Sequence, residues 1–559
     1  MHHRARNRNR IFDHSSARKI DGGFVMTRCV RFTIAFCLAA GAAHGAEDPY
    51  LSPLALAIHR DTLYAADATA ARIETVSTAK MRVVRTLDTG GAPNGIAVSP
   101  DGKRLYVTIG AEDGRVLEIK PRSGKTVAEC AAGHTPNSPV LSPDGKTLYV
   151  CSRFTNEVVI IDVKDFSEVG RIAVTREPVA AALTPDGARL FVANLLPAGR
   201  ANSGYVSAVV DVIDTAARNV CAAITLPNGS TALHGICVSP DGAFVYVTHL
   251  LSRYQLPTTQ LERGWVNTNA VSVIDAHSMT LVNTFLLDDV DLGAANPWGV
   301  TCSSDGRWLV AAHAGPHELS IIDRAALHRK LDEAAANGAE KSVPNDLAFL
   351  VGIRERCALG GKGPRGIAAS GSRVFAAEYY SGSIGVVDLA QAAPRTASSL
   401  PLGRQPDPDP VRAGEMLFHD AADCFQQWQS CASCHPGGAR VDALNWDMMN
   451  DGLGTPKNTK NLLLSHQTPP AMATGVRETA EIAVRAGIRN ALFNTLDESR
   501  AVQLDEYLKS LKPVASPLLV DGALSAAAER GKLVFDTAKC SRCHPAPLFT
   551  DMKSHDVGT

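Results

Sequence analysis

The chain has 559 residues, of which 45% are hydrophobic, and a formal net charge of −1. This length and composition provide apolar cores for roughly two to four domains. A near-zero charge, with no long basic run beyond the N-terminus, argues against nucleic acid as a partner. No apolar stretch approaches the length that spans a bilayer, so we expect no integral membrane segment in the mature chain.

Residues 1–45 are predicted to be an upstream basic segment followed by a signal peptide. A short basic head at 26–31 precedes an apolar stretch, 32–43, and small residues at 43–45 offer a cleavage site. An unusually long basic head is the alternative interpretation of residues 1–25. Either interpretation exports the mature protein, and we expect a periplasmic location.

Residues 46–404 repeat one pattern, in which an apolar run enters an Asp-Gly turn and an aromatic or β-branched run follows. The copies are centred on Asp101, Asp144, Asp186, Asp241 and Asp305, with weaker copies opening at Leu54 and Gly366. Glycine after aspartate supplies the positive φ that a tight hairpin needs. A period of about 42 residues with four strand-like runs is typical of a propeller blade. Seven copies therefore predict an all-β, seven-bladed propeller.

The runs 105–108 and 245–248 resemble the YVTN family of β-propellers. Two insertions, 196–204 and 249–270, separate the second and third strands of their blades, which predicts that they share one rim. We expect either a docking surface for the following module or a partner, or ordinary loops. The rim residues are His249, Arg253, Tyr254, Arg263 and Trp265. The insertion 325–344 is helix-like and is expected to be structural. No position in this region shows a catalytic constellation.

After a stiff polar linker at 402–410, the hydrophobic period becomes helical and predicts two α-helical c-type cytochrome domains, 405–515 and an incomplete 516–559. Each contains C-x-x-C-H, at 431–435 and 540–544. This pattern is typical of covalent haem: both thiols bond the porphyrin, and the imidazole binds its iron. A redox or zinc C-x-x-C is the alternative for one copy, and two copies favour haem. We expect two haems, with Cys431, Cys434, Cys540 and Cys543 attaching them and His435 and His544 ligating iron.

The segments 412–418, 430–435, 451–454, 468–470, 529–535 and 547–559 resemble the bacterial di-haem cytochrome c peroxidase/MauG family. The resemblance implies that hydrogen peroxide reacts at the first haem while the second relays electrons. It also implies a small redox protein as electron donor or as protein substrate. The family's segment carrying the sixth ligand of the second haem has no counterpart before residue 559.

The resemblance also suggests catalytic residues. A Glu following a Gly-Arg segment matches Glu481, with Arg477 beside it, and this Glu would be the acid/base. A solvated Glu on a helix face is the alternative for Glu481. Trp446 is a candidate electron relay between the haems, and a core Trp packed on porphyrin is the alternative.

Three functions follow from these patterns. The first is a peroxidase or MauG-like oxidase. The second is a non-catalytic electron-transfer cytochrome that uses its propeller as a protein-docking platform. The third, dehydrogenase chemistry within the propeller, lacks any identifiable quinone-forming pair.

Overall fold

The computed structural model describes residues 48–256, 266–446, 457–472 and 475–556. The predicted basic segment and signal peptide, the rim residues Arg263 and Trp265, and the family-like segment 451–454 lie outside the described residues. In the part of the chain that is described, no helix has the length and apolar character needed to cross a membrane.

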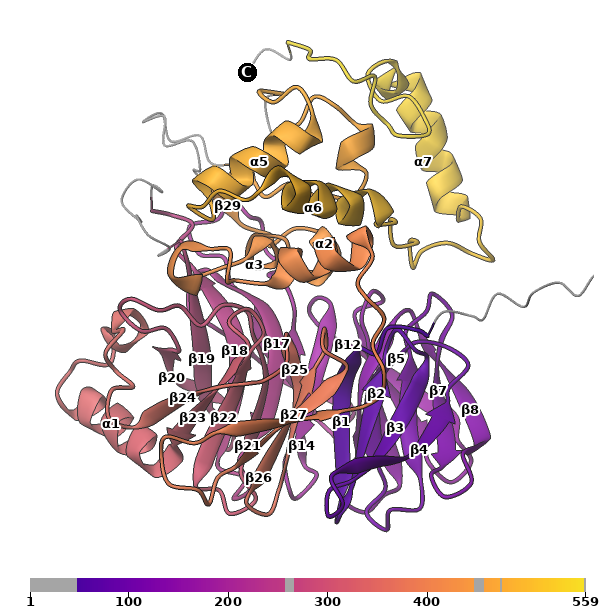
Figure 1. The fold of residues 1–559 in the computed structure, drawn as a ribbon. Helices are drawn as coiled ribbons and strands as arrows, with labels where there is room; N and C mark the ends of the chain where they lie inside the picture. Colours follow the sequence, from indigo (N-terminus) through magenta and orange to yellow (C-terminus); the bar gives the residue numbers. More distant parts are fainter. Residues whose placement is uncertain (1–47, 257–265, 447–456, 473–474, 557–559) are drawn as a thin grey trace, which may run out of the picture. The chain divides into compact units, whose positions relative to one another are not determined.

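Seven four-stranded antiparallel sheets follow one another along residues 53–401, which confirms the seven-bladed propeller (Figure 1). The first four blades are β1 (Pro53–His59), β2 (Thr62–Asp67), β3 (Arg72–Ser77), β4 (Arg82–Asp88); β5 (Pro93–Val98), β6 (Leu105–Ile109), β7 (Gly114–Lys120), β8 (Lys125–Gly133); β9 (Pro136–Leu141), β10 (Thr147–Ser152), β11 (Glu157–Asp162), β12 (Ser167–Ala173); and β13 (Pro178–Leu183), β14 (Arg189–Asn194), β15 (Val209–Asp214), β16 (Asn219–Thr225).

The last three blades are β17 (Ser230–Val238), β18 (Phe244–Ser252), β19 (Asn267–Asp275), β20 (Thr280–Leu286); β21 (Pro297–Cys302), β22 (Trp308–His313), β23 (Glu318–Asp323), β24 (Arg354–Ala358); and β25 (Pro364–Ser370), β26 (Arg373–Glu378), β27 (Ser383–Asp388), β28 (Ala397–Pro401). Strands pair in chain order within every blade, and the second strand of each blade is almost wholly buried.

The repeated Asp-Gly turn connects the first and second strands of a blade through one set of hydrogen bonds. Ser99 Oγ donates to Asp101 Oδ1 at 2.7 Å, and Arg104 N donates to Ser99 Oγ at 2.9 Å. Gly102 adopts φ +69°, a left-handed conformation that costs glycine little. The same hydroxyl–aspartate pair recurs at Ser142, Thr184, Ser239 and Ser303. The turn chemistry therefore sets the blade period that the sequence displays.

The ring closes by packing the first blade against the seventh. Gly366 on β25 lies against β1 so closely that an added Cβ would be 2.6 Å from Leu54 O. Buried Leu63 and Val76 of the first blade form one hydrophobic cluster with Phe375 and Ile384 of the seventh. Apolar burial joins the two ends of the repeat without exchange of a strand between blades.

The insertions differ from the predicted loops in one respect. β18 and β19 are nine residues each, so residues 249–252 and 267–270 extend the strands rather than forming a loop. In blade six the helix-like insertion is α1 (Arg324–Ala336), followed by η3 (Val343–Asn345). Leu327 and Leu331 bury one face of α1 in the core of that blade.

The helical region that follows comprises α2 (Pro410–His419), η4 (Phe425–Gln427), α3 (Cys431–Cys434), α4 (Pro436–Ala439), β29 (Asn445–Trp446), β30 (Lys457–Asn458), η5 (Ser465–Gln467), α5 (Ala480–Asn490) and α6 (Glu498–Ser510). α2 and α6 pack together at Gly414, where an added Cβ would be 1.9 Å from Gln503 O. Phe418, Leu504 and Leu508 form the buried core between the two helices.

The last described elements are α7 (Ala526–Thr537) and η6 (Cys540–Arg542). No residue of α7, all of which the structure describes, is buried; Leu533 is 68% exposed and Val534 is 67% exposed.

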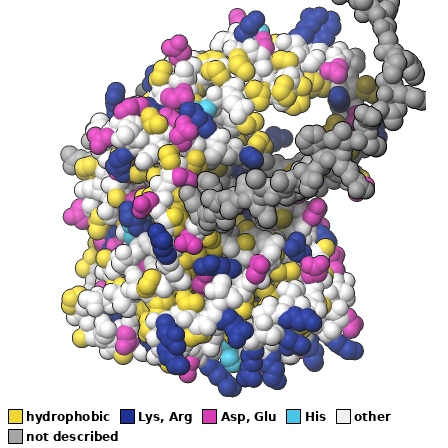
Figure 2. All heavy atoms as spheres, turned by 45° about the vertical axis from the view of Figure 1, so that its right-hand side comes forward, with side chains coloured by type: hydrophobic (Ala, Val, Ile, Leu, Met, Phe, Trp, Pro, Cys, Tyr) yellow, Lys and Arg dark blue, Asp and Glu magenta, His cyan; other side chains and the backbone are white. Residues whose placement is uncertain are grey.

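On the face drawn in Figure 2, basic and acidic side chains are interspersed, in keeping with 56 Lys and Arg against 57 Asp and Glu.

Candidate haem-attachment site

The first C-x-x-C-H motif folds as a short capped helix. Ser430 Oγ accepts a hydrogen bond from Ala432 N at 3.2 Å, and Ser433 Oγ accepts one from Ser430 N at 3.0 Å. This reciprocal capping box satisfies two backbone donors at the start of α3. Cys431 and Cys434 thus share one helical turn, and His435 ends it. All eleven cysteines of the described residues are free thiols.

The histidine of each motif is held in the tautomer that a metal ligand needs. His435 Nδ1 lies 3.1 Å from Arg440 O, and His544 Nδ1 lies 2.9 Å from Phe549 O. Since a carbonyl only accepts, each Nδ1 carries the proton and each Nε2 keeps its lone pair. Burial also lowers the pKa of His435 to about 4, which keeps its ring neutral. Both motifs therefore fit haem iron chemically, with the same carbonyl contact five residues downstream.

Buried asparagines of the propeller bind the first motif. Asn296 Nδ2 donates to Ser430 Oγ at 2.8 Å, and Ser433 Oγ donates to Asn296 Oδ1 at 2.7 Å. Asn267 Nδ2 lies 3.3 Å from Cys434 Sγ. Asn269 Nδ2, from the same strand β19, donates to Trp428 O at 3.1 Å. The propeller thus supplies side-chain partners to the attachment helix itself.

An ion cluster joins the segment after His435 to the third and fourth blades. Glu177 is 6% exposed and pairs with Arg153 at 3.0 Å and with Arg440. Arg153 also donates to Gly437 O at 3.4 Å. Burial raises the pKa of Glu177, but the two guanidiniums outweigh it and the pKa is lowered overall. The carboxylate is therefore charged and bridges the two parts of the site.

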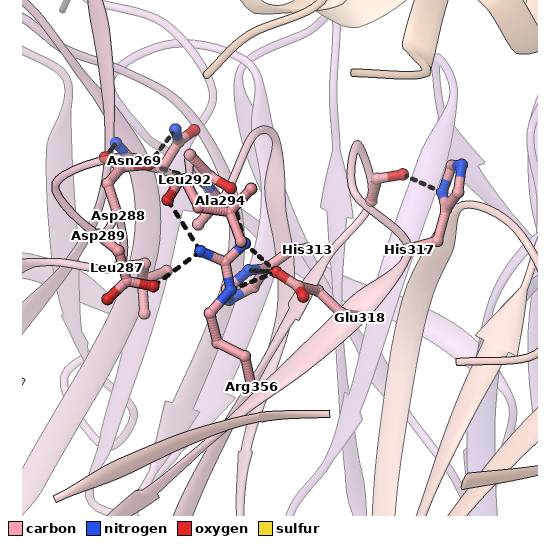
Figure 3. Close-up of polar contacts among 12 residues, drawn as sticks. Asn269, Leu287, Asp288, Asp289, Leu292, Ala294, His313, His317, Glu318 and Arg356 are labelled. Atoms are coloured by element: carbon pink, nitrogen blue, oxygen red, sulfur yellow. Dashed lines mark hydrogen bonds and ion pairs between the residues drawn. The ribbon is translucent and has the colours of Figure 1, made fainter. Parts of the chain in front are cut away.

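Figure 3 shows the polar network behind the asparagines. Asp288 Oδ2 accepts from Asn269 N at 2.7 Å, and Asp288 Oδ1 accepts from Asn269 Nδ2 at 2.8 Å. Arg356 bridges Glu318 and Asp289, and Glu318 in turn lies 3.3 Å from His313 Nδ1. Burial raises the pKa of Asp288 to about 6. The network fixes the orientation of Asn269 toward Trp428.

Trp446 lies against the propeller. It is 4% exposed and packs with Val206, Tyr254 and Val266, and its Nε1–H donates to Asp442 Oδ2 at 2.7 Å. Tyr254 belongs to the predicted rim, so this part of the insertion contacts the helical region. His249 is instead buried within its blade, bonded to Leu250 O and Ser272 Oγ. Rim residue Arg253 donates to Asn345 Oδ1 at 2.7 Å and so supports blade six.

Glu481 and Arg477 lie together, in the lining of a surface pocket of about 540 Å³ beside α5. The side chain of Glu481 is 41% exposed and lies 3.7 Å from Lys509. Its pKa is lowered by a hydrogen bond from its own backbone N–H and by the Thr479 hydroxyl. This environment is that of a surface carboxylate that stays ionised, which is the alternative that the sequence also allowed.

The second motif lies in a different environment. Cys540 is exposed, and neither α7 nor η6, both fully described, contains a buried residue. Among the described residues, those of both motifs included, no group of three or more His, Cys, Asp and Glu side chains is arranged to hold a metal ion. The first motif is therefore the site that tertiary structure surrounds.

The asparagines were missed at the sequence level. Asn267 and Asn269 follow the long insertion in blade five, and Asn296 precedes β21. Alternate positions on a strand share one face, which was the available signal. Nothing in the sequence indicated that this face meets the C-x-x-C-H helix.

No family model matches the chain. Hydrazine synthase subunit gamma of Kuenenia stuttgartiensis is 32% identical over 169 residues, 27% of this chain and 48% of that protein. Hydrazine synthase subunit beta of the same organism is 28% identical over 246 residues, 42% of this chain and 60% of that protein. The chain therefore spans about half the length of the curated relatives it matches.

Among solved structures, a chain of Kuenenia stuttgartiensis hydrazine synthase superposes with a TM-score of 0.56 at 25% identity. The superposition covers 63% of this chain and 99% of that chain. The propeller fold and the sequence matches agree: the chain is homologous to hydrazine synthase subunits beta and gamma.

Proposed function

We propose that this protein is an exported, periplasmic redox protein that carries two covalent c-type haems. Cys431 and Cys434 would hold the first and Cys540 and Cys543 the second, with His435 and His544 as iron ligands. The observation that carries the proposal is the recurrence of one ligand geometry, an Nδ1 contact to the carbonyl five residues downstream, in both motifs. A C-x-x-C-H sequence that occurred by chance would have no reason to place its histidine Nδ1 against that carbonyl.

A bound haem would supply one-electron chemistry at its iron, and the residues of the chain define the setting. Arg440 O holds the proton of His435 on Nδ1, so that Nε2 is the ligand atom. Asn267 directs an N–H toward Cys434 Sγ, and Asn296 anchors both serines of the attachment helix. The propeller in this proposal is a rigid support for the first haem, and it also shields that haem from water.

Homology favours redox chemistry of small inorganic nitrogen compounds as the physiological role. The relatives are subunits of an enzyme named for hydrazine synthesis, and this chain matches two of them. A peroxidase or MauG-like activity is the second candidate, supported by the family-like segments around both motifs. The exposed, ion-paired position of Glu481 supports it less, because a base for peroxide chemistry works best at a pKa near the operating pH.

The test uses the full chain produced in a host that attaches c-type haem. A potentiometric titration followed by visible absorption is expected to show two reducible haems. Two results together would favour the nitrogen role. Hydrazine would reduce the oxidised protein, and the reduced protein would not turn over hydrogen peroxide with a reduced donor protein. A protein without covalent haem would refute the proposal.

Glu481→Gln separates the two candidates. If peroxide turnover exists and Glu481 is its acid/base, the variant loses roughly 100-fold in rate while keeping both haems. Glu506→Gln is the matched control, because Glu506 also pairs with Lys509 on the same surface, at 3.2 Å. Equal rates in both variants would remove Glu481 from the mechanism.

A further inference from the structure

The centre of the propeller contains a cavity of about 630 Å³. Its wall is formed by the innermost strand of every blade, β1, β5, β9, β13, β17, β21 and β25. Residues of α2, α3, α4 and α6 line one end, among them His419 and Tyr507. The volume suits a small molecule. The two haem motifs do not use this cavity through any of their cysteines or histidines, none of which lines it.

Arg365 lines the cavity without an ion-pair partner among the described residues. It is 8% exposed, and its guanidinium carbon lies 3.5 Å from the ring centre of Tyr379 and 4.6 Å from that of Trp298. Arg365 Nη2 donates to Tyr380 Oη at 3.2 Å. Among the described residues Arg365 forms no ion pair. Aromatic rings therefore cover its faces, and its N–H edge remains for a ligand.

Two other arginines that are buried or partly buried in the same region have carboxylate partners. Arg153 pairs with Glu177 at 3.0 Å, and Arg412 pairs with Glu415 at 2.7 Å. Glu415 also lines the cavity and its charge acts on Arg365 through space, but its ion pair is with Arg412. A buried guanidinium without a counter-ion is costly, so the charge of Arg365 calls for an anion from elsewhere.

The cavity also contains two imidazoles, which add no charge to that of Arg365. His234 stacks on Trp298 with ring centres 3.9 Å apart, and His419 Nδ1 lies 2.9 Å from Glu415 O. Burial lowers the pKa of His234 to about 3 and that of His419 to about 4, and nearby arginines lower both further. Both rings are neutral and add polar atoms, but no charge, beside Arg365.

We propose that the central cavity is a binding site for a small planar oxyanion, held at the N–H edge of Arg365. A guanidinium matches the two oxygens of a carboxylate or of a planar inorganic oxyanion with parallel hydrogen bonds. The anion has two sources: a free ion that diffuses in, or a propionate of the first haem. The inference does not depend on the proposed redox function, because the haem-free chain tests it alone.

Isothermal titration calorimetry with acetate and with nitrate, at constant ionic strength set by chloride, measures the site in the full chain. Arg365→Gln is expected to weaken binding at least tenfold, and Arg365→Lys to weaken it less. Arg307→Gln is the matched control, because exposed Arg307 also stacks on a tryptophan, Trp308, at 4.7 Å but lies outside the cavity. The control is expected to bind both anions as the parent does.

The haem-loaded chain and the haem-free Cys431→Ser/Cys434→Ser variant separate the two sources. Binding in both forms identifies a free anion. Binding only in the haem-free form identifies a haem propionate as the native occupant. Equal affinity in the parent and in Arg365→Gln, or no binding by either form at millimolar anion, would overturn the proposal. Thermal unfolding of each variant without anion verifies that it is folded.

Discussion

The two C-x-x-C-H motifs have the same local geometry and opposite surroundings. His435 and His544 each direct Nδ1 to a carbonyl five residues on. The first motif is bonded to Asn267 and Asn296 of the propeller, whereas the helix preceding the second, α7, buries no residue.

The motif determines the tautomer of its histidine, whereas the surrounding fold determines the polarity and charge around the motif. Five residues and the turn after them set the tautomer of the ligand histidine. Desolvation, hydrogen bonds to sulfur and charge near the site come from the propeller, and they act on the first motif. Two haems held by these motifs would therefore differ in redox behaviour because of their surroundings.

The largest expected difference is in thiol reactivity of the haem-free chain. Desolvation raises the pKa of Cys431 and of Cys434 to about 12, so about one thiol in 10,000 is a thiolate at pH 8. Cys540, by contrast, is exposed to solvent and accessible to a reagent. Maleimide is expected to modify Cys540 at least about a hundredfold faster than Cys431 and Cys434. Peptide mass spectrometry measures the three rates.

Exposed Cys221 and buried Cys151 of the propeller calibrate the fast and slow limits of that experiment. Labelling of Cys431 at the rate of Cys221 would show that the first motif is not enclosed.

Glu177→Gln tests what anchors the first motif. Removing the carboxylate leaves the partly buried guanidiniums of Arg153 and Arg440 without an ion-pair partner, which costs at most about 3–5 kcal/mol. Hydrogen exchange of the α3 amides, read by mass spectrometry, is expected to accelerate accordingly, while exchange in α7 stays unchanged.

The control is Glu498→Gln, which breaks the ion pair of Arg485 with a carboxylate that is 72% exposed. An exposed pair contributes at most about 1 kcal/mol, so exchange in α3 should hardly change. An α3 that exchanges at the parental rate in Glu177→Gln would contradict the anchoring role.

Two equivalent glycines sharpen the comparison. Gly414 precedes Phe418 by four residues in α2, and Gly531 precedes Phe535 by four in α7. A Cβ at Gly414 would meet Gln503 O at 1.9 Å, whereas a Cβ at Gly531 would meet nothing within 4 Å. Gly414→Ala is expected to destabilise the helical region by about 1–3 kcal/mol.

Gly531→Ala is expected to stabilise α7 by up to about 1 kcal/mol, since alanine is the better helix former. Protease sensitivity of residues 405–511 and the helix content from circular dichroism measure the two effects. Loss of stability in both variants would mean that α7 packs against a surface.

The last comparison concerns the pH dependence of folding stability near the first motif. Burial raises the pKa of Asp442 to about 6, so the folded state binds its proton more tightly than the unfolded state does. Stability from this group is therefore present at pH 4 and is lost as pH rises through about 6. Asp442→Asn should remove roughly 1–3 kcal/mol of that dependence.

The free energy of unfolding, measured at pH 4.5 and at pH 7.5, tests the sign of this pH dependence. Asp536→Asn, an exposed position in α7, is the control and should change stability by less than about 0.5 kcal/mol at either pH. A parent that gains stability steadily from pH 4.5 to pH 7.5, with no change in slope in Asp442→Asn, would contradict the assignment.

Sequence patterns predicted the parts of the molecule that repeat or that follow local rules. Five Asp-Gly turns and two weaker copies of the repeat predicted seven blades, and cysteine spacing predicted both candidate haem motifs. Tertiary placement was not accessible: Asn296 touches the first motif across 134 positions of chain, and Trp446 packs on the propeller. Glu481 matched a family offset, but only the fold could reveal its ion pair with Lys509.

The haem content of the full chain and of two motif variants tests the central claim most directly. Intact mass and a pyridine haemochrome spectrum of protein from a haem-attaching host should give two haems for the parent. Cys431→Ser/Cys434→Ser and Cys540→Ser/Cys543→Ser should each retain one. A parent that carries no covalent haem would contradict the claim. So would a double variant that still carries two haems, because the substituted motif would then not attach one.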